Sequence, residues 1–330
     1  MDFTDLIDLA SEKLGGAVLF ANDDFFAPKE NLLKASAPVW REGEYTDRGK
    51  WMDGWESRRR RTPGFDWCII RLGLPGIIRG ITVDTSYFRG NYPEHCSLEG
   101  ATFDGLPTVE ELTDESVQWV PLLPQMALAG DSQNHFPIEY NERITHLRFK
   151  IYPDGGVARL RVYGIVSPDW DRLTRSGDID LAAAENGALV VSCSDMFFGH
   201  RHNLIMPGRA ANMSDGWETK RRRGPGHDWA IIKLARPGLI HSVEVDTSHF
   251  KGNFPESCSL ETYNATEDQD ELSDLSVAWT SLLQRTKLQA HTRHYFDHEL
   301  HDAGVASHIR FNIYPDGGVS RLRVYGKLVD

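Results

Sequence analysis

Short apolar runs, alternating or continuous, recur along the chain between Gly, Pro and Asn residues. Their length and boundaries are typical of strands in a β-sandwich. The clearest runs in the first half are residues 67–72, 77–83, 147–152 and 160–163. Residues with turn chemistry separate or follow them: Pro75-Gly76, Gly90-Asn91 and Asp154-Gly155-Gly156. The pattern predicts an all-β fold.

The opening segment is the one place where the pattern predicts a helix. Its apolar residues follow helical spacing: Phe3, Leu6, Ile7, Ala10 and Leu14. Gly15-Gly16 is typical of a helix end. We therefore expect a short N-terminal helix that leads into the strands.

The chain repeats itself. Residues 52–72 match residues 214–234 at 14 of 21 positions, and residues 83–99 match residues 245–261 at 13 of 17. The offset is 162 in both, and it also relates FKIYPDGGVARLRVYG (149–164) to FNIYPDGGVSRLRVYG (311–326). Near the N-terminus a weaker match has an offset of 172, so ten residues are missing from the second copy between Asn203 and Asp215. A repeated unit of this size predicts duplicated domains.

The boundary between the copies is expected at the polar stretch that begins with Ser167-Pro168. This gives two domains, residues 1–167 and residues 168–330. With short strands and turn-rich connections, each copy is expected to form a jelly-roll β-sandwich.

Composition and charge narrow the function. A net charge of -12 argues against nucleic acid and anionic membranes as partners, because binding to either begins with a basic surface. No apolar run approaches the roughly 18 residues of a membrane span, and the first residues are acidic, unlike a targeting signal. The four cysteines show no CxxC spacing and are expected to be reduced thiols. We expect a cytoplasmic protein with a small-molecule partner.

The first candidate segment is DGWESRRRR (53–61) with PGFDW (63–67), repeated as DGWETKRRR (215–223) with PGHDW (225–229). Arginine presents a planar fork of donors that fits a carboxylate, so arginines beside acidic and aromatic residues suit a small anionic ligand. The alternative is a solvated edge strand whose arginines pair with surface acids. Joint retention of Asp, Trp, Glu and arginines in both copies favours a binding loop.

The second segment, DTSYFRGNYPE (84–94), is repeated as DTSHFKGNFPE (246–256). It follows a strand, and loops at strand ends commonly carry function. Asp84 and Asn91 can instead make local turn hydrogen bonds. The third repeated segment, YPDGGV, is interpreted as structural because Pro-Asp-Gly is hairpin-turn chemistry.

Histidines are unevenly distributed, with three before residue 168 and ten after it. The densest group is His291, His294, His298, His301 and His308. No HExxH signature accompanies it, so satisfied or surface histidines are a better interpretation than a metal site. The chain also lacks a GxSxG elbow, a Walker loop and a dinucleotide fingerprint.

These motifs together resemble the allantoicase family: DGWExxRRR with PGxDW, DTSxFxGNxPE and IYPDGGVxRLRVYG, each present twice over residues 15–328. The resemblance implies two tandem jelly-roll repeats similar to galactose-binding-like sandwiches. It implies hydrolysis of allantoate to ureidoglycolate and urea in purine degradation, and assembly into homo-oligomers such as trimers or hexamers. No cofactor is certain, and activation by a divalent metal such as manganese is left open.

Allantoate carries one carboxylate and two ureido groups, and residue types suggest roles for each. A carboxylate or a histidine is expected to act as general base on water, or to assist urea departure through an imine-like intermediate before hydration. The candidate catalytic residues are Glu56, Asp84, Glu218 and Asp246. The candidate substrate-binding residues are Arg59, Arg60, Asn91, Arg221, Arg222 and Asn253.

Whether both copies are active is left open, because the aligned pairs Arg58/Lys220, Phe65/His227, Tyr87/His249 and His95/Ser257 differ. The rival interpretation is a non-catalytic carbohydrate- or small-ligand-binding sandwich, since a fold of this class does not establish function.

Overall fold

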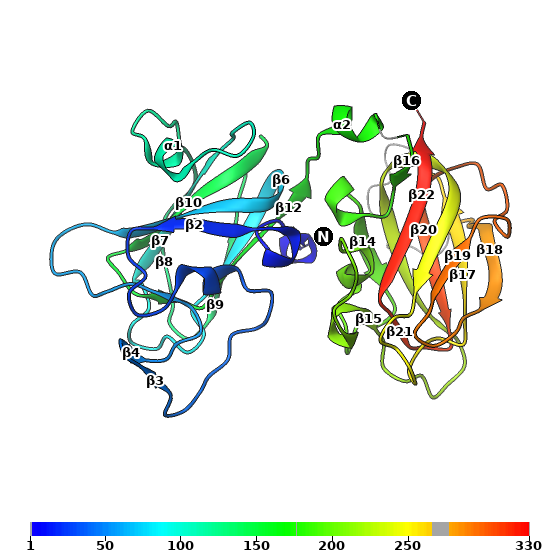
Figure 1. Ribbon diagram of the computed structural model, residues 1–330, viewed down its shortest axis with the longest axis horizontal. Helices are drawn as coiled ribbons and strands as arrows, with labels where there is room; N and C mark the ends of the chain where they lie inside the picture. The colour runs from blue at the N-terminus through cyan, green and yellow to red at the C-terminus, as the bar shows by residue number, and fades with distance from the viewer. Residues whose placement is uncertain (1, 176, 266–276, 330) are drawn as a thin grey trace. The chain divides into compact units, whose positions relative to one another are not determined.

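The computed structural model describes residues 2–175, 177–265 and 277–329, which form two compact units. One unit contains residues 2–167 and the other the described residues from Pro168 onward (blue to green and green to red in Figure 1). Each is a β-sandwich with a few short helices. None of the helices in the described part of the chain has the length and apolar character needed to cross a lipid bilayer.

The first unit is built on one eight-stranded antiparallel sheet. The strand order is β1 (Ile7–Asp8), β12 (Arg159–Val166), β6 (Asp66–Asp84), β10 (Ile144–Tyr152), β7 (His95–Ala101) and β8 (Val120–Ala127). Two more strands, β2 (Ala17–Ala21) and β9 (Gln133–Pro137), also pair with β6. The short strands outside the sheet are β3 (Tyr45–Thr46) with β4 (Gly49–Lys50), and β5 (Trp55–Glu56) with β11 (Gly156–Val157).

The second unit repeats this order, so the sequence repeat is a structural repeat. Its strands are β13 (Ile179–Asp180), β22 (Arg321–Leu328), β16 (Asp228–Asp246), β20 (Val305–Tyr314), β17 (Ser257–Tyr263) and β18 (Thr280–Lys287), with β14 (Leu189–Cys193) and β19 (Arg293–Phe296) on β16. The short pair is β15 (Trp217–Glu218) with β21 (Gly318–Val319). The described residues of this unit contain no counterpart of the β3–β4 hairpin.

Helices are short in both units. The α-helices are α1 (Val109–Thr113) and α2 (Trp170–Thr174). The 3₁₀-helices are η1 (Phe3–Asp5), η2 (Glu12–Leu14), η3 (Lys29–Leu33), η4 (Ala184–Asn186), η5 (Arg201–Ile205) and η6 (Met213–Asp215).

The prediction of a turn at Pro75-Gly76 is wrong, because both residues lie inside the continuous strand β6. Residues 66–71 of β6 pair with β10 and β2, whereas residues 76–84 pair with β12 and β9; Gly76 also keeps one pairing with β10, to Ile144. The register against β10 shifts at this point. A Cβ on Gly76 would lie 2.3 Å from the Ile165 carbonyl oxygen, so glycine allows the two strands to approach. The pair is a bend that lets one strand serve both layers of the sandwich.

The predicted N-terminal helix is also wrong as a single element, since η1, β1 and η2 take its place. Ile7 and Asp8 pair with β12, and the Asp8 carboxylate accepts the N–H groups of Ala10 and Val162. These sheet contacts satisfy backbone groups that a helix would otherwise pair internally. Gly15, with φ 91°, ends η2 where the sequence predicted a stop.

A buried ion pair fixes the chain segment that precedes β5. The Arg159 side chain is fully buried, and its Nη2 lies 2.7 Å from Oδ2 of Asp53. The same guanidinium donates to the carbonyls of Ser36 and Asp53. Burial alone raises the pKa of Asp53, but hydrogen bonds from Arg159 and from the Val39 N–H outweigh it and hold the pKa below its usual value. Arg321 and Asp215 form the equivalent contact in the second unit.

We expect Arg159→Met to lower the free energy of unfolding of the first unit by about 3 kcal/mol, because it leaves a buried carboxylate without its main partner. Hydrogen exchange of β5 and β12 measures this opening locally. The control is Arg41→Met, which removes an exposed pair with Glu44 and is expected to change stability by less than about 0.5 kcal/mol. Equal effects of the two substitutions would contradict the assignment.

Candidate functional site

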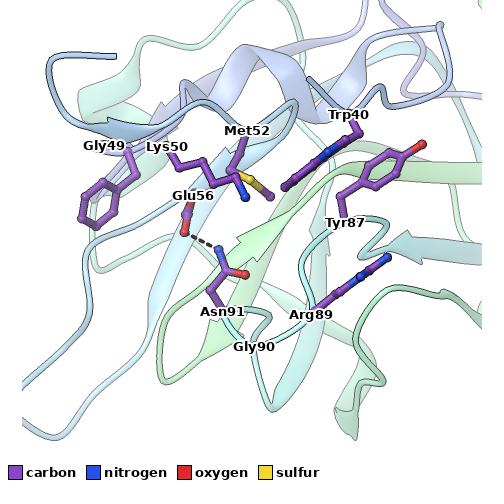
Figure 2. Close-up of a pocket in the computed structure, with 10 residues that line it drawn as sticks. Trp40, Gly49, Lys50, Met52, Glu56, Tyr87, Arg89, Gly90 and Asn91 are labelled. Atoms are coloured by element: carbon purple, nitrogen blue, oxygen red, sulfur yellow. Dashed lines mark hydrogen bonds between the residues drawn. The ribbon is translucent and has the colours of Figure 1, made fainter. Parts of the chain in front are cut away.

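A cavity of about 550 Å³ opens in the first unit between β5, the β3–β4 hairpin and the loop that follows β6. Its lining residues come from four separate segments: Phe26, Trp40, Gly49, Lys50, Met52, Glu56, Tyr87, Arg89, Gly90 and Asn91. Figure 2 shows the side chains of Lys50 and Met52 between Trp40 and Glu56. The volume suits a small molecule, and the wall combines aromatic and charged groups.

Glu56 is the acidic group of this cavity. It lies at the end of β5, where its backbone pairs with Gly156. Burial raises the pKa of its carboxyl, and a 2.7 Å hydrogen bond from Asn91 Nδ2 to Oε1 offsets only part of that rise. No cationic side chain of the described residues forms an ion pair with it. A carboxylate in this setting holds a proton more readily than an exposed one, as a general base requires.

Two cations, Lys50 and Arg89, lie in the same wall. The Lys50 ammonium is 3.9 Å from the centroid of the Trp40 ring, and no carboxylate among the described residues is in ion-pair distance of it. Arg89 Nε is 3.0 Å from Asp131 Oδ2, and this arginine side chain is 80% exposed. Lys50 is therefore available to an anionic ligand, and Arg89, whose ion pair uses Nε, can still offer its Nη groups.

The loop that carries Arg89 is held in an unusual backbone conformation. Tyr87 has a backbone φ of 69°, a value that residues other than glycine rarely adopt. Its N–H donates to Oδ1 of Asp131 at 2.8 Å, and this bond, together with Arg89, holds the pKa of Asp131 below its usual value. The Tyr87 ring lies 5.9 Å from the Trp40 ring. Local strain of this kind is common where side chains are aimed at a ligand.

The structure brings together two of the five residues that the sequence singled out in the first copy, Glu56 and Asn91. Arg59 is exposed and lies outside the cavity lining, and its side chain forms no hydrogen bond or ion pair with another described residue. Arg60 places Nη1 2.6 Å from the buried carboxylate of Asp66. Asp84 is 5% exposed and accepts the N–H of Ser86. The Asp84 contact is the local turn hydrogen bond considered above, whereas the partner of Arg60 is a buried acid and not a surface one. The site roles of Arg59, Arg60 and Asp84 stay predictions.

The equivalent residues of the second unit gather differently. A cavity of about 630 Å³ is lined by Phe198, Glu218, Thr219, Arg221, Arg222, Gly252, Asn253, Phe254, Glu256, Lys287, Leu288, Pro315, Asp316 and Gly317. Four of the five candidates in this copy therefore share one cavity. Asp246 does not; it is fully buried, accepts the N–H of Ser248 and lies 3.4 Å from Arg209.

Sequence reasoning missed Trp40, Lys50 and Met52. All three lie in the stretch that is ten residues longer than its counterpart in the second copy. This difference in length was the one feature of the sequence that could have pointed to them. The β3–β4 hairpin packs over Phe26, since a Cβ on Gly49 would lie 3.7 Å from its ring. Phe25 and Phe26 are 40% and 36% exposed, whereas Phe197 and Phe198 in the second unit are 70% and 61% exposed.

The histidine group of the second copy mainly makes structural contacts. His291 Nδ1 accepts the backbone N–H of His249, and His294 Nε2 accepts that of Gln289. The His298 side chain is 97% exposed. Within the described ranges, no three His, Cys, Asp or Glu side chains are grouped as a metal site requires. Activation by manganese stays a prediction that the geometry does not test.

We expect Glu56→Gln to stabilise the protein at neutral pH. Because burial raises the pKa of Glu56, its ionisation opposes folding once the pH exceeds the ordinary glutamate pKa. The gain in melting temperature should vanish at acidic pH, where both states are protonated. It should grow as the pH rises above the ordinary glutamate pKa and level off above the folded pKa. The control is Glu42→Gln, at an exposed position, for which no such pH-dependent gain is expected. A destabilised or pH-independent Glu56→Gln would contradict the prediction.

The sequence and the fold of this chain are both similar to those of known proteins. The pattern described as the allantoicase repeat matches residues 7–167 and 179–329. The allantoicase of Dictyostelium discoideum is 50% identical over 324 residues, covering 98% of this chain and 87% of the relative. A probable allantoicase of Pseudomonas aeruginosa is 48% identical, covering 98% and 96%. The crystal structure of allantoicase from Saccharomyces cerevisiae superposes with a TM-score of 0.83 at 36% identity, covering 97% and 92%. The chain belongs to the allantoicase family.

Proposed function

We propose that the cavity of the first repeat is where this chain carries out the activity of its family. That activity is hydrolysis of allantoate to ureidoglycolate and urea in purine degradation. The observation that carries the proposal is Glu56, a carboxylate with a raised pKa and no cationic partner among the described residues. Its cavity also contains Asn91 and the cations Lys50 and Arg89.

The groups of the cavity match the groups of allantoate. Lys50 and Arg89 bind the carboxylate, since cationic donors form the stronger hydrogen bonds with an ionised acceptor. The Asn91 amide, already aligned on Glu56, offers its oxygen to a ureido N–H. Trp40 and Tyr87 flank the ligand and exclude water from its faces. Exclusion of water strengthens each of these polar contacts.

Glu56 acts as the base in either order of events. In direct displacement, it takes a proton from water, whose oxygen bonds to the central carbon as the bond from that carbon to one ureido nitrogen breaks. The proton then passes to the departing urea. In the stepwise order, Glu56 takes an N–H proton from the retained ureido group and transfers it to the departing urea, leaving a carbon–nitrogen double bond to which water adds. A raised pKa favours both proton transfers.

Replacement of the base tests the proposal directly. We expect Glu56→Gln to lower kcat for urea release about 10²- to 10⁴-fold, because the amide cannot accept the proton. Assays with and without chelator and added manganese separate this loss from a metal effect. Glu42→Gln, at an exposed position on the neighbouring loop, is the matched control. A Glu56→Gln protein with kcat near that of the unmodified chain would exclude Glu56 as the base.

The cation assignment makes a different prediction. We expect Lys50→Met and Arg89→Met each to raise KM about tenfold, with a smaller effect on kcat, because they remove contacts made to the unreacted carboxylate. Arg59→Met, assayed in parallel, decides between this assignment and the one expected from sequence. A larger rise in KM for Arg59→Met than for either of the others would overturn the assignment to Lys50 and Arg89.

We also propose a cytoplasmic location and assembly into a homo-oligomer, a trimer or hexamer. Support for the location comes from the four cysteines, all free thiols and three of them buried, as suits a reducing compartment. The assembly rests on the family alone. Cell fractionation and light scattering are the measurements that test these two proposals.

A further inference from the structure

The cavity of the second repeat shares an acid–amide pair with the first cavity but has a different wall. It lies between the segment that follows β15, the loop before β17, the end of β18 and the turn before β21. Like the first cavity, it contains a carboxylate and amide in contact, since Asn253 Nδ2 donates to Oε1 of Glu218. The wall that the β3–β4 hairpin supplies in the first repeat has no counterpart here among the described residues.

All three carboxylates of this cavity already have donors. Glu218 accepts from Asn253, as described above. Asp316 accepts the backbone N–H of Arg222 at 2.9 Å. Glu256 forms an ion pair of 3.0 Å with Arg285.

Two cations of the same wall form no ion pair with a described residue, although the charge of Lys287 helps to lower the pKa of Glu256. Arg221 and Lys287 are both exposed side chains that line the cavity. Neither forms an ion pair with a described carboxylate. Because neither cation is held in such an ion pair, both ends can reach the carboxylate of a small ligand.

The second of these cations distinguishes the two repeats. In β18, Lys287 pairs in register with Ser257, and at the equivalent position of β8, Ala127 pairs with His95. The lysine is exposed and packs into no core, so the sandwich itself does not require it. Lys287 therefore adds to this cavity a positive charge that the first repeat lacks at the equivalent position.

We propose that the second-repeat cavity is a separate binding site for a small carboxylate that carries a ureido group. Arg221 and Lys287 bind the carboxylate. The Glu218–Asn253 pair binds the ureido group. The carboxylate accepts hydrogen bonds from the ureido N–H groups, and the amide N–H donates to the ureido carbonyl oxygen. The ureido part of this inference rests on the role proposed for the equivalent Glu56–Asn91 pair, whereas the carboxylate part stands on the second repeat alone.

Calorimetric titration of the full-length protein with N-carbamoylglycine tests the inference. This compound has a carboxylate and one ureido group but lacks the second ureido nitrogen that the stepwise order requires. A urea assay of the titrated sample shows whether any of it is consumed by direct displacement. We expect two equivalents per chain. Arg221→Met with Lys287→Met should remove one equivalent, or weaken it about tenfold or more. Arg223→Met with Lys327→Met removes the same charge from exposed positions outside the cavity, and should leave both equivalents.

The outcomes separate this inference from the proposed function. If the Arg221/Lys287 double variant binds as many equivalents as the unmodified chain, or if the unmodified chain binds none, the second site is excluded. A Lys50→Met, Arg89→Met double variant should also lose one equivalent, because it removes the cations of the first cavity. That result tests the proposed function and leaves the second site intact. Melting curves of each variant show that the lost equivalent reflects the missing cations and not an unfolded repeat.

Discussion

The close approach of Gly156 to the Phe88 ring is the constraint on which the site depends. A Cβ on Gly156 would lie 1.9 Å from that ring, so only glycine fits. Gly156 also pairs with Glu56 across β11 and β5, and its N–H donates to the Asn91 carbonyl at 2.7 Å. One contact therefore sets the spacing of the strand that carries the acid and the loop that carries the amide. Gly318 and Phe250 repeat it in the second unit.

On this shared frame, a loop of different length produces two different cavities. In the first repeat the β3–β4 hairpin adds Lys50 beside Trp40 and covers Phe26, which gives an enclosed wall around Glu56. In the second repeat the cavity lies instead beside Arg221 and Lys287. Duplication thus preserved the acid–amide pair while the cations around it changed. This arrangement is consistent with one repeat serving catalysis and the other serving binding, as proposed above.

Charge distribution suits an anionic substrate despite the net charge of -12. The carboxylates near the two cavities are engaged by amides, backbone N–H groups or cations, as Asn253 engages Glu218. Cations such as Lys50 and Arg221 are left without ionic partners among the described residues. These cations give each cavity donors for a small anion, although the net charge of the chain is negative.

The sequence by itself determined the duplication, the all-β class, the family and the candidacy of Glu56 and Asn91, because local motifs repeated at one offset report all of these. It did not determine that β6 passes through Pro75, since strand pairing overrides local turn preference. Nor did it determine that Arg60 pairs with Asp66 or that the hairpin brings Lys50 to Glu56. The partner of a charged side chain and the enclosure of a cavity depend on segments distant in the chain, and only the tertiary structure decides which of them meet.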